Sequence, residues 1–281
     1  MSRIVYVNGE YLPEEDAKIS VFDRGFLFAD GVYEVSSVLD GKLVDNAAHL
    51  VRLARSLAEL RMESPLPPQE IEAVQNEMIA RNNLVEGALY LQVSRGAADR
   101  DFSIPKDARP SLVMFTQAKK LADNPAAQKG WSVIMVEDIR WKRRDIKTVQ
   151  LLAPSLAKQA ALDAGADDAW MVEDGFVTEG TSNNAWIVKG GRLITRHLSP
   201  EILHGITRRA VMRLAAEDGL EVEERAFTPQ EAMEADEAFV TSATSFVMPV
   251  VRIDGKLVGN GNPGSVTARL RQLYIEEARR G

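Results

Sequence analysis

The stretch "SLVMFTQAKKLADNPAAQKGWSVIMVEDI", residues 111–139, decides how this chain is organised. Two apolar segments typical of β-strands stand at its ends, and the polar residues between them include Pro125 and Gly130, which interrupt regular structure. Such a break is typical of a domain boundary, and a long loop inside one domain is the alternative. The expected parts are a small N-terminal α/β domain (residues 1–118), an interdomain linker (119–130) and a larger C-terminal domain (131–281).

Hairpin and helix signals recur on both sides of this break. Five turn dipeptides lie between alternating apolar positions and predict β-hairpins: Asn8-Gly9, Asp40-Gly41, Asp174-Gly175, Gly190-Gly191 and Asp254-Gly255. Five segments have helical patterns: 47–62, 68–83, 154–164, 206–219 and 265–280. Because the strands gather in hairpins instead of alternating regularly with helices, we expect a mixed α+β protein.

Composition limits the classes of function. The 281 residues carry 34 basic and 41 acidic side chains, a net charge of -7, which is too acidic for a dedicated nucleic-acid binder. The chain has no cysteine and three scattered histidines, so we expect neither a disulfide framework nor a metal site. The sequence shows no signal peptide and no apolar run near the ~18 residues of a spanning helix, so we expect a cytoplasmic protein without a membrane partner.

A lysine at an unusual border is the first candidate for chemistry. In "DIRWKRRDIKTVQLLAP", residues 138–154, a charged run ends and Lys147 opens a nearly uncharged segment. The ordinary interpretation is that a strand ends there and the ammonium reaches water along its own methylene groups. The alternative is that the amine has a buried function, which other residues must support.

Polar groups that could support it lie where strands meet turns or helices. Glu179 is followed by hydrogen-bonding residues in "VTEGTSNNAWIV", residues 177–188, a composition that also suits a solvated turn. Gly205 precedes a helix that begins with Ile206 and Thr207, and the free N–H groups at such a start bind anions, although every helix has a start. The segment "VTSATSF", residues 240–246, is a second hydroxyl-rich strand end.

Three residues of the N-terminal half are open to two interpretations. Arg52 lies between leucines of a predicted helix, where an arginine either extends to solvent or pairs with a buried anion. Tyr33 follows the Asp30-Gly31 turn, and either its hydroxyl faces a cleft or its ring packs in the interior. Arg100 lies in a loop, where arginine is usually solvated but can also hold a carboxylate with two hydrogen bonds.

Taken together, these motifs resemble the fold-type IV pyridoxal-phosphate enzymes, and most closely the D-amino acid aminotransferases. The motifs in chain order are "YVNGEYL", "DRGFLFADGVYEV", "HLVRL", "YLQVSRG", "EDIRWKRRDIKTVQLLAPSLAKQ", "VTEGTSNNAWIV", "HGITRRAV", "FVTSAT" and "VVRIDGKLVGNG". Their shared order and spacing extend over nearly the whole chain. The resemblance implies a small α/β domain, a larger domain with an antiparallel-rich sheet or barrel, and pyridoxal 5′-phosphate at the domain interface.

The resemblance also implies roles for individual residues. Lys147 is the Schiff-base lysine, and Glu179 is the partner of the cofactor's pyridine nitrogen. The implied cofactor contacts are Arg52, Lys147, Glu179, Ser182, Asn183, Gly205, Ile206, Thr207, Ser242 and Ala243. The implied substrate contacts are Tyr33, Tyr90, Arg100 and Phe102.

Two positions depart from the family pattern. Phe102 stands where the D-amino acid enzymes typically have a histidine, which helps the loop arginine to trap the α-carboxylate of the substrate. Because a phenyl ring cannot donate a hydrogen bond, carboxylate binding is expected to weaken by ~1 to 3 kcal/mol, and (R)-amines without a carboxylate could be admitted. Ala243 stands where a threonine often contacts the phosphate, but its backbone N–H remains.

The reaction implied is transamination of a D-amino acid such as D-alanine or D-glutamate with a 2-oxo acid such as 2-oxoglutarate or pyruvate, in ping-pong order through a Lys147 aldimine. The same resemblance implies a homodimer. Alternatives on the same fold are a branched-chain L-amino acid aminotransferase, an (R)-amine aminotransferase and an aminodeoxychorismate lyase. The alternative from another class is a non-catalytic protein that binds pyridoxal phosphate; it would be expected to lack the lysine or the carboxylate, and both are present.

Overall fold

The computed structural model describes residues 2–280, which fall into two compact units. The chain up to Lys120 forms the first unit together with the segment Ile146–Gln150, and Leu121–Asp145 and Leu151–Arg280 form the second. The segment that contains Lys147 therefore belongs to the first unit, although the chain on both sides of it belongs to the second. The domain boundaries predicted from the sequence, with a linker between residues 118 and 131, did not assign the segment Ile146–Gln150 to the first unit.

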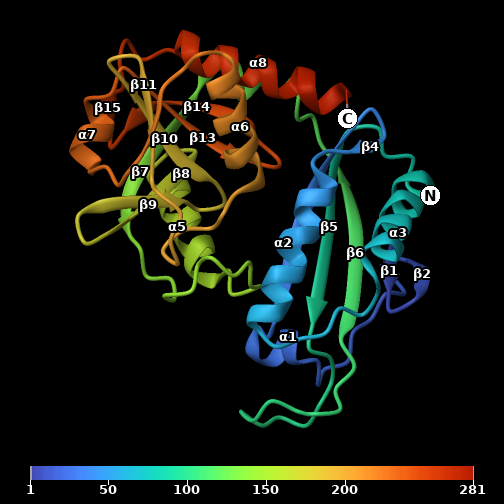
Figure 1. Ribbon diagram of the computed structural model, residues 1–281. Coiled ribbons are helices and arrows are strands. Elements are labelled where there is room, and N and C mark those ends of the chain that lie inside the picture. The colour runs from blue at the N-terminus through green and yellow to red at the C-terminus, as the bar shows by residue number, and fades with distance from the viewer. Residues whose placement is uncertain (1, 281) are drawn as a thin grey trace. The chain divides into compact units, whose positions relative to one another are not determined.

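The first unit is built on one antiparallel sheet. Its elements are β1 (Ile4–Val7), β2 (Glu10–Pro13), α1 (Arg24–Phe28), β3 (Gly31–Leu39), β4 (Lys42–Leu43), α2 (Asn46–Glu59), α3 (Pro68–Arg81), β5 (Gly87–Ser94) and β6 (Ser111–Ala118). The six strands follow the order β2-β1-β6-β5-β3-β4. Helix α2 packs on β3, and α3 packs on β1 and β6. Figure 1 shows both helices beside the long strands, with the loop between β5 and β6 running beyond their ends.

Amphipathic patterning explains this packing. Leu53 and Leu57 of α2 are almost wholly buried, as are Leu89, Leu91 and Val93 of β5. Burial of each such side chain stabilises the fold by about 1.5–3 kcal/mol relative to exposure. The helical spacing of the leucines therefore holds α2, and with it Arg52, against the sheet.

The second unit contains a larger mixed sheet. Its elements are α4 (Pro125–Lys129), β7 (Trp131–Glu137), α5 (Leu152–Asp163), β8 (Asp168–Glu173), β9 (Phe176–Gly180), β10 (Asn184–Lys189), β11 (Arg192–Thr195), α6 (Ile206–Glu217), β12 (Val222–Glu224), α7 (Pro229–Met233), β13 (Glu237–Ser242), β14 (Phe246–Ile253), β15 (Lys256–Leu257) and α8 (Ser265–Arg280). The strand order is β12-β11-β10-β13-β14-β7-β8-β9, with β15 beside β14. Most pairs are antiparallel, but β11–β12, β14–β7 and β7–β8 are parallel.

This sheet curls, because β9, at the end of the strand order, also lies beside β10. The Gly180 N–H donates to the Asn183 carbonyl at 2.9 Å across that junction. The interior is filled by large side chains from several strands, and Trp170 and Phe227 meet edge to face at 6.1 Å between ring centroids. Helix α8 packs on β13, β14 and α6, and α5 packs on β7 and β8. The curled, antiparallel-rich sheet confirms the predicted α+β architecture.

All five predicted hairpins are confirmed as antiparallel strand pairs. Both turn residues have positive φ in each, for example 50° at Asn8 and 105° at Gly9. Such turns match the right-handed twist of the strands, and asparagine, aspartate and glycine adopt them at least cost. The five predicted helices are present as α2, α3, α5, α6 and α8. The short helices α1, α4 and α7 were missed, and α4 lies within the predicted linker. Within residues 2–280, no helix has the length and apolar character needed to cross a membrane.

Candidate active site

The predicted site residues are divided between the two units, and Lys147 belongs to the first. The Tyr33 N–H donates to the Lys147 carbonyl at 3.0 Å, and the Val149 N–H donates to the Gly31 carbonyl at 3.1 Å. These bonds attach the segment to the start of β3. The Lys147 side chain is half-buried, and its Nζ lies 4.2 Å from the centroid of the Tyr33 ring. Among residues 2–280, no carboxylate forms an ion pair with this amine.

An aromatic row lies beside Lys147 in the first unit. The rings of Tyr33, Tyr90 and Phe115, from β3, β5 and β6, stack with centroids 5.6 Å and 4.7 Å apart. The Tyr90 hydroxyl donates to Gln92 Oε1 at 2.8 Å. Burial, with a smaller contribution from Tyr33, raises the pKa of Tyr90 well above its usual value, so this phenol stays protonated. The structure thus brings together Lys147 and two of the predicted substrate contacts.

Arg52 is buried on α2 and paired with Glu34 of β3. Its Nε and Nη2 donate to the two carboxylate oxygens at 2.8 Å and 2.7 Å, and His49 Nδ1 lies 2.7 Å from Glu34 Oε2. Burial by itself would raise the pKa of Glu34, but the charge and hydrogen bonds of Arg52, helped by His49, lower it to about 2. The guanidinium plane is therefore fixed by a partner that is ionised near neutral pH. Arg52 was predicted from the sequence to bind an anion, but its contacts with Glu34 and His49 were not predicted.

Arg100 and Phe102 lie on the exposed loop between β5 and β6. The Arg100 guanidinium carbon lies 5.5 Å from the Phe28 ring and 5.8 Å from the Phe102 ring, which itself meets Phe28 edge to face. Buried Arg24 holds this loop by donating to the Asp101 carbonyl at 2.7 Å. Over the described part of the chain, no hydrogen bond or ring contact joins this group to Lys147. The structure therefore does not place Arg100 and Phe102 with the other predicted substrate contacts.

In the second unit, Glu179 lies near the end of β9, and its carboxylate is only 3% exposed. It accepts hydrogen bonds from Arg140 Nη1 at 2.5 Å, from Asn184 Nδ2 at 3.0 Å and from the Leu203 N–H at 3.1 Å. Burial raises the pKa of Glu179 above its usual value, and Arg140 opposes that rise. A solvated carboxylate, the ordinary interpretation of Glu179, is therefore excluded.

The two amides after Glu179 have different partners. Asn184 donates to Glu179 and also to the Leu203 carbonyl, whereas Asn183 donates to Asp168 at 2.7 Å. Ser182 is exposed. The structure thus brings Asn184 to the carboxylate, a residue that the sequence analysis missed, and turns the side chain of the predicted Asn183 toward Asp168. The alternation of side chains where β10 begins could have indicated that only one amide faces Glu179.

The start of α6 and the end of β13 are the two segments predicted from the sequence to contact the phosphate. The first N–H groups of a helix have no intrahelical acceptor, and no described side chain caps α6 at Gly205. A Cβ at Gly205 would lie 2.0 Å from Asn184 Oδ1, so a larger residue would have to displace that amide. Thr207 is 3% exposed in the first turn. At the end of β13, the side chains of Ser242 and Ser245, which flank Ala243, contact each other. Ser242 Oγ lies 2.6 Å from Ser245 Oγ and accepts a hydrogen bond from the Ser245 N–H.

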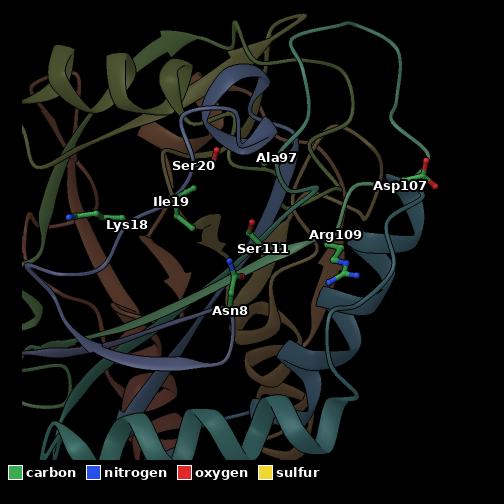
Figure 2. Close-up of a pocket in the computed structure, with 8 residues that line it drawn as sticks. All are labelled: Asn8, Lys18, Ile19, Ser20, Ala97, Asp107, Arg109 and Ser111. Atoms are coloured by element: carbon green, nitrogen blue, oxygen red, sulfur yellow. The ribbon is translucent and has the colours of Figure 1, made fainter.

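A pocket of about 430 Å³ lies elsewhere in the first unit, lined by Asn8, Lys18, Ile19, Ser20, Ala97, Asp107, Arg109 and Ser111. Figure 2 shows Lys18 and Arg109 pointing away from each other rather than into a common space. Two of its central polar groups already have partners, because Asn8 accepts from the Leu112 N–H and Ser111 donates to Asp23. The predicted site residues do not line this pocket, and it is not assigned to the chemistry.

The residues present fit pyridoxal 5′-phosphate. Lys147 has an amine that pairs with no carboxylate of residues 2–280, a group of the kind that reacts with an aldehyde, and Glu179 is a buried carboxylate of the kind that suits a pyridine nitrogen. The start of α6, shaped by Gly205, offers the N–H groups that a phosphate needs.

Comparison with known proteins agrees with this fit. The amino-transferase class IV family model matches residues 31–253. The chain is 38% identical to the D-alanine aminotransferase of Staphylococcus epidermidis over 273 residues, 96% of each chain. It is also 38% identical to the D-alanine aminotransferase of Bacillus licheniformis over 267 residues, 95% of this chain and 94% of the other. Its structure matches a T.th. branched-chain amino acid aminotransferase with pyridoxamine 5′-phosphate at a TM-score of 0.93 and 28% identity, covering 99% and 94% of the two chains. The chain therefore belongs to the class IV amino-transferase family and is an aminotransferase that uses pyridoxal 5′-phosphate.

Proposed function

We propose that this chain transfers the amino group of a D-amino acid, of the D-alanine or D-glutamate type, to a 2-oxo acid such as 2-oxoglutarate or pyruvate. The observation that carries the proposal is the match, over 96% of the chain, to a relative named D-alanine aminotransferase. The amine of Lys147 beside Tyr33 supports amino-group transfer, and the occurrence of Arg100 after the "SRG" motif favours the D-amino acid class.

Each residue has a proposed task. When bound, pyridoxal 5′-phosphate supplies a ring that accepts electrons and so stabilises negative charge at the substrate α-carbon. The proposed role of Lys147 Nζ is to take the proton from that carbon and to return it later as an acid. The proposed role of Glu179 is to hold a proton at the pyridine nitrogen. The first turn of α6, together with Arg52, is proposed to bind the phosphate.

Two other substrate classes have an observation in their favour. The structural neighbours include branched-chain amino acid aminotransferases, which favours L-leucine and its relatives as substrates. Phe102, an exposed phenyl ring where a donor is expected, favours (R)-amines that have no carboxylate. Both classes would share Lys147 and Glu179, because the cofactor chemistry is common to them.

A substrate panel separates the three classes. The purified protein, loaded with pyridoxal 5′-phosphate, is given 2-oxoglutarate with D-alanine, L-leucine or (R)-1-phenylethylamine, and the stereochemistry of the product is determined. We expect D-alanine to react fastest. Faster turnover of L-leucine or of the amine would exclude the proposal. Borohydride reduction followed by peptide mapping should label Lys147, and a label elsewhere would exclude its assigned role.

The finer features of the protein are also proposals. We propose a homodimer that acts in the cytoplasm, where amino acids and 2-oxo acids are exchanged. The similarity to class IV aminotransferases over nearly the whole chain supports this assembly. Sedimentation of the purified protein and fractionation of cells that express it would test the two statements.

A further inference from the structure

Arg140 connects two buried carboxylates of the second unit. Its Nη1 donates to Glu179, while Nε and Nη2 donate to the two oxygens of Asp138 at 2.9 Å and 2.7 Å. Asp138 also accepts from the Thr178 hydroxyl at 2.7 Å. The Asp138 side chain is 0% exposed and that of Arg140 12%, so water screens these charges little. One cation is therefore shared between two acids.

The nearby charges outside this group do not replace Arg140. Arg144 donates to Glu173 at 2.7 Å and 3.0 Å, and it lies 3.5 Å from Asp138. Its charge is thus directed at Glu173 and Asp138. The other two partners of Glu179, the Asn184 amide and the Leu203 N–H, are neutral. Among residues 2–280, Arg140 is the cation that contacts the Glu179 carboxylate.

These contacts set opposing influences on one carboxyl group. Burial raises the pKa of Glu179, Asp138 adds to the rise, and Arg140 lowers it. A carboxyl group and a pyridine nitrogen that face each other share one proton, which stays with the stronger base. Any change that strengthens the carboxylate as a base moves the proton away from the nitrogen. Loss of Arg140 would have that effect, and loss of the Asp138 charge would have the opposite effect.

We propose that Arg140 is a positioning residue that makes Glu179 surrender the shared proton to the pyridine nitrogen of the cofactor, with Asp138 holding Arg140 in place and limiting its effect. The inference rests on the proposed function only in taking Glu179 as the partner of that nitrogen. It assigns a role to two residues of the charged segment 138–145 that the family resemblance left without one. A ring that keeps its proton is the better electron acceptor, so the network would act on the rate of proton removal from substrate.

The test compares Arg140→Met, Arg140→Lys and Asp138→Asn in protein loaded with cofactor labelled with ¹⁵N in the ring. The measurement is the nitrogen chemical shift, which differs between the protonated and the unprotonated ring. We expect Arg140→Met to lose the protonated signal and Arg140→Lys, which keeps the charge, to retain it. Asp138→Asn removes the negative charge but keeps an oxygen that can accept a hydrogen bond from Arg140. In this variant, the signal of the protonated ring nitrogen should persist to a higher pH than it does in the unaltered protein.

A second measurement needs no cofactor. In apoprotein with ¹³C-labelled glutamate, the Glu179 carboxyl should titrate at higher pH after Arg140→Met and at lower pH after Asp138→Asn. A purely structural role would move both variants in the same direction or neither, and either result would overturn the inference. If Arg140→Met does not fold, Arg140→Gln, which also removes the charge but keeps a hydrogen-bond donor, is measured in its place and should shift the Glu179 titration to higher pH. If the unaltered protein forms no borohydride-reducible bond at Lys147, the proposed function fails instead.

Discussion

The buried pair of Glu34 and Arg52 allows a stability prediction whose size can be worked out. Glu34 is 1% exposed, and its pKa is lowered from 4.5 to about 2. That difference corresponds to about 3 kcal/mol of folding stability near neutral pH. Removal of one partner of a buried ion pair typically costs ~3–5 kcal/mol, which agrees. The substitution Glu34→Gln, which keeps the shape and removes the charge, should therefore destabilise the apoprotein by about 3 kcal/mol.

The pH dependence of this loss gives the prediction its sign. A carboxyl whose pKa is lowered by folding stabilises the protein fully above its unfolded value of 4.5, and the stabilisation disappears as the pH falls toward about 2. The difference between the unaltered protein and Glu34→Gln should thus be largest near pH 7 and shrink steadily below pH 4.5. Urea unfolding at one protein concentration across this pH range measures it.

A matched variant shows whether the effect belongs to the buried pair. Glu77 pairs with Arg81 at 2.7 Å on the surface of α3, where both side chains are 45% exposed. Exposed pairs contribute little, so Glu77→Gln should change the unfolding free energy by less than about 0.5 kcal/mol at every pH. The reasoning is refuted if Glu34→Gln costs less than about 1 kcal/mol near pH 7, or if its cost does not change with pH.

Three shorter predictions concern the second unit and the exposed loop. Thr207→Ala removes a buried hydroxyl from the start of α6. In an equilibrium titration, it should raise the dissociation constant of pyridoxal 5′-phosphate about tenfold, which is equivalent to about 1.4 kcal/mol. An unchanged dissociation constant would show that Thr207 does not contact the phosphate. Gly205→Ala places a methyl group 2.0 Å from Asn184 Oδ1 and should destabilise the protein by about 1–3 kcal/mol in thermal unfolding, and a neutral result would mean that the amide can move freely. Phe102→His restores a donor on an exposed ring and should lower KM for D-alanine about tenfold with no effect on thermal stability; equal KM values would show that this position does not meet the carboxylate.

The regular elements could be predicted because local chemistry determines them. The dipeptide at each hairpin adopts positive φ with little strain, and the leucine spacing of α2 is set by one buried face. The short helix α1 was missed because it is a single turn between buried Asp23, which caps it, and a left-handed Ala29. The parallel pairing of β7 with β8 was also missed, since it joins segments separated by the whole of α5.

In the predicted site, too, contacts between residues far apart in the sequence could not be predicted. Lys147 and Glu179 could be singled out from short motifs, but their surroundings depend on contacts between distant parts of the chain. Arg140 lies in a run of charges that suggests a solvated surface, and its partner Glu179 comes 39 residues later. The attachment of Lys147 to β3 joins residues more than a hundred positions apart, through the hydrogen bond from the Tyr33 N–H.

The acidic side chains of the charged segment before Lys147, and those that its arginines contact, are paired with arginines. Arg140 contacts Glu179 and Asp138, Arg144 contacts Glu173, and Arg143 contacts Asp145 at 3.0 Å. Each of these carboxylates already forms an ion pair with an arginine, and none forms one with Lys147. A carboxylate beside Lys147 would favour the charged ammonium, which cannot attack an aldehyde. The amine lies instead over the Tyr33 ring, 4.2 Å from its centroid, a contact that leaves the nitrogen without a carboxylate partner among residues 2–280.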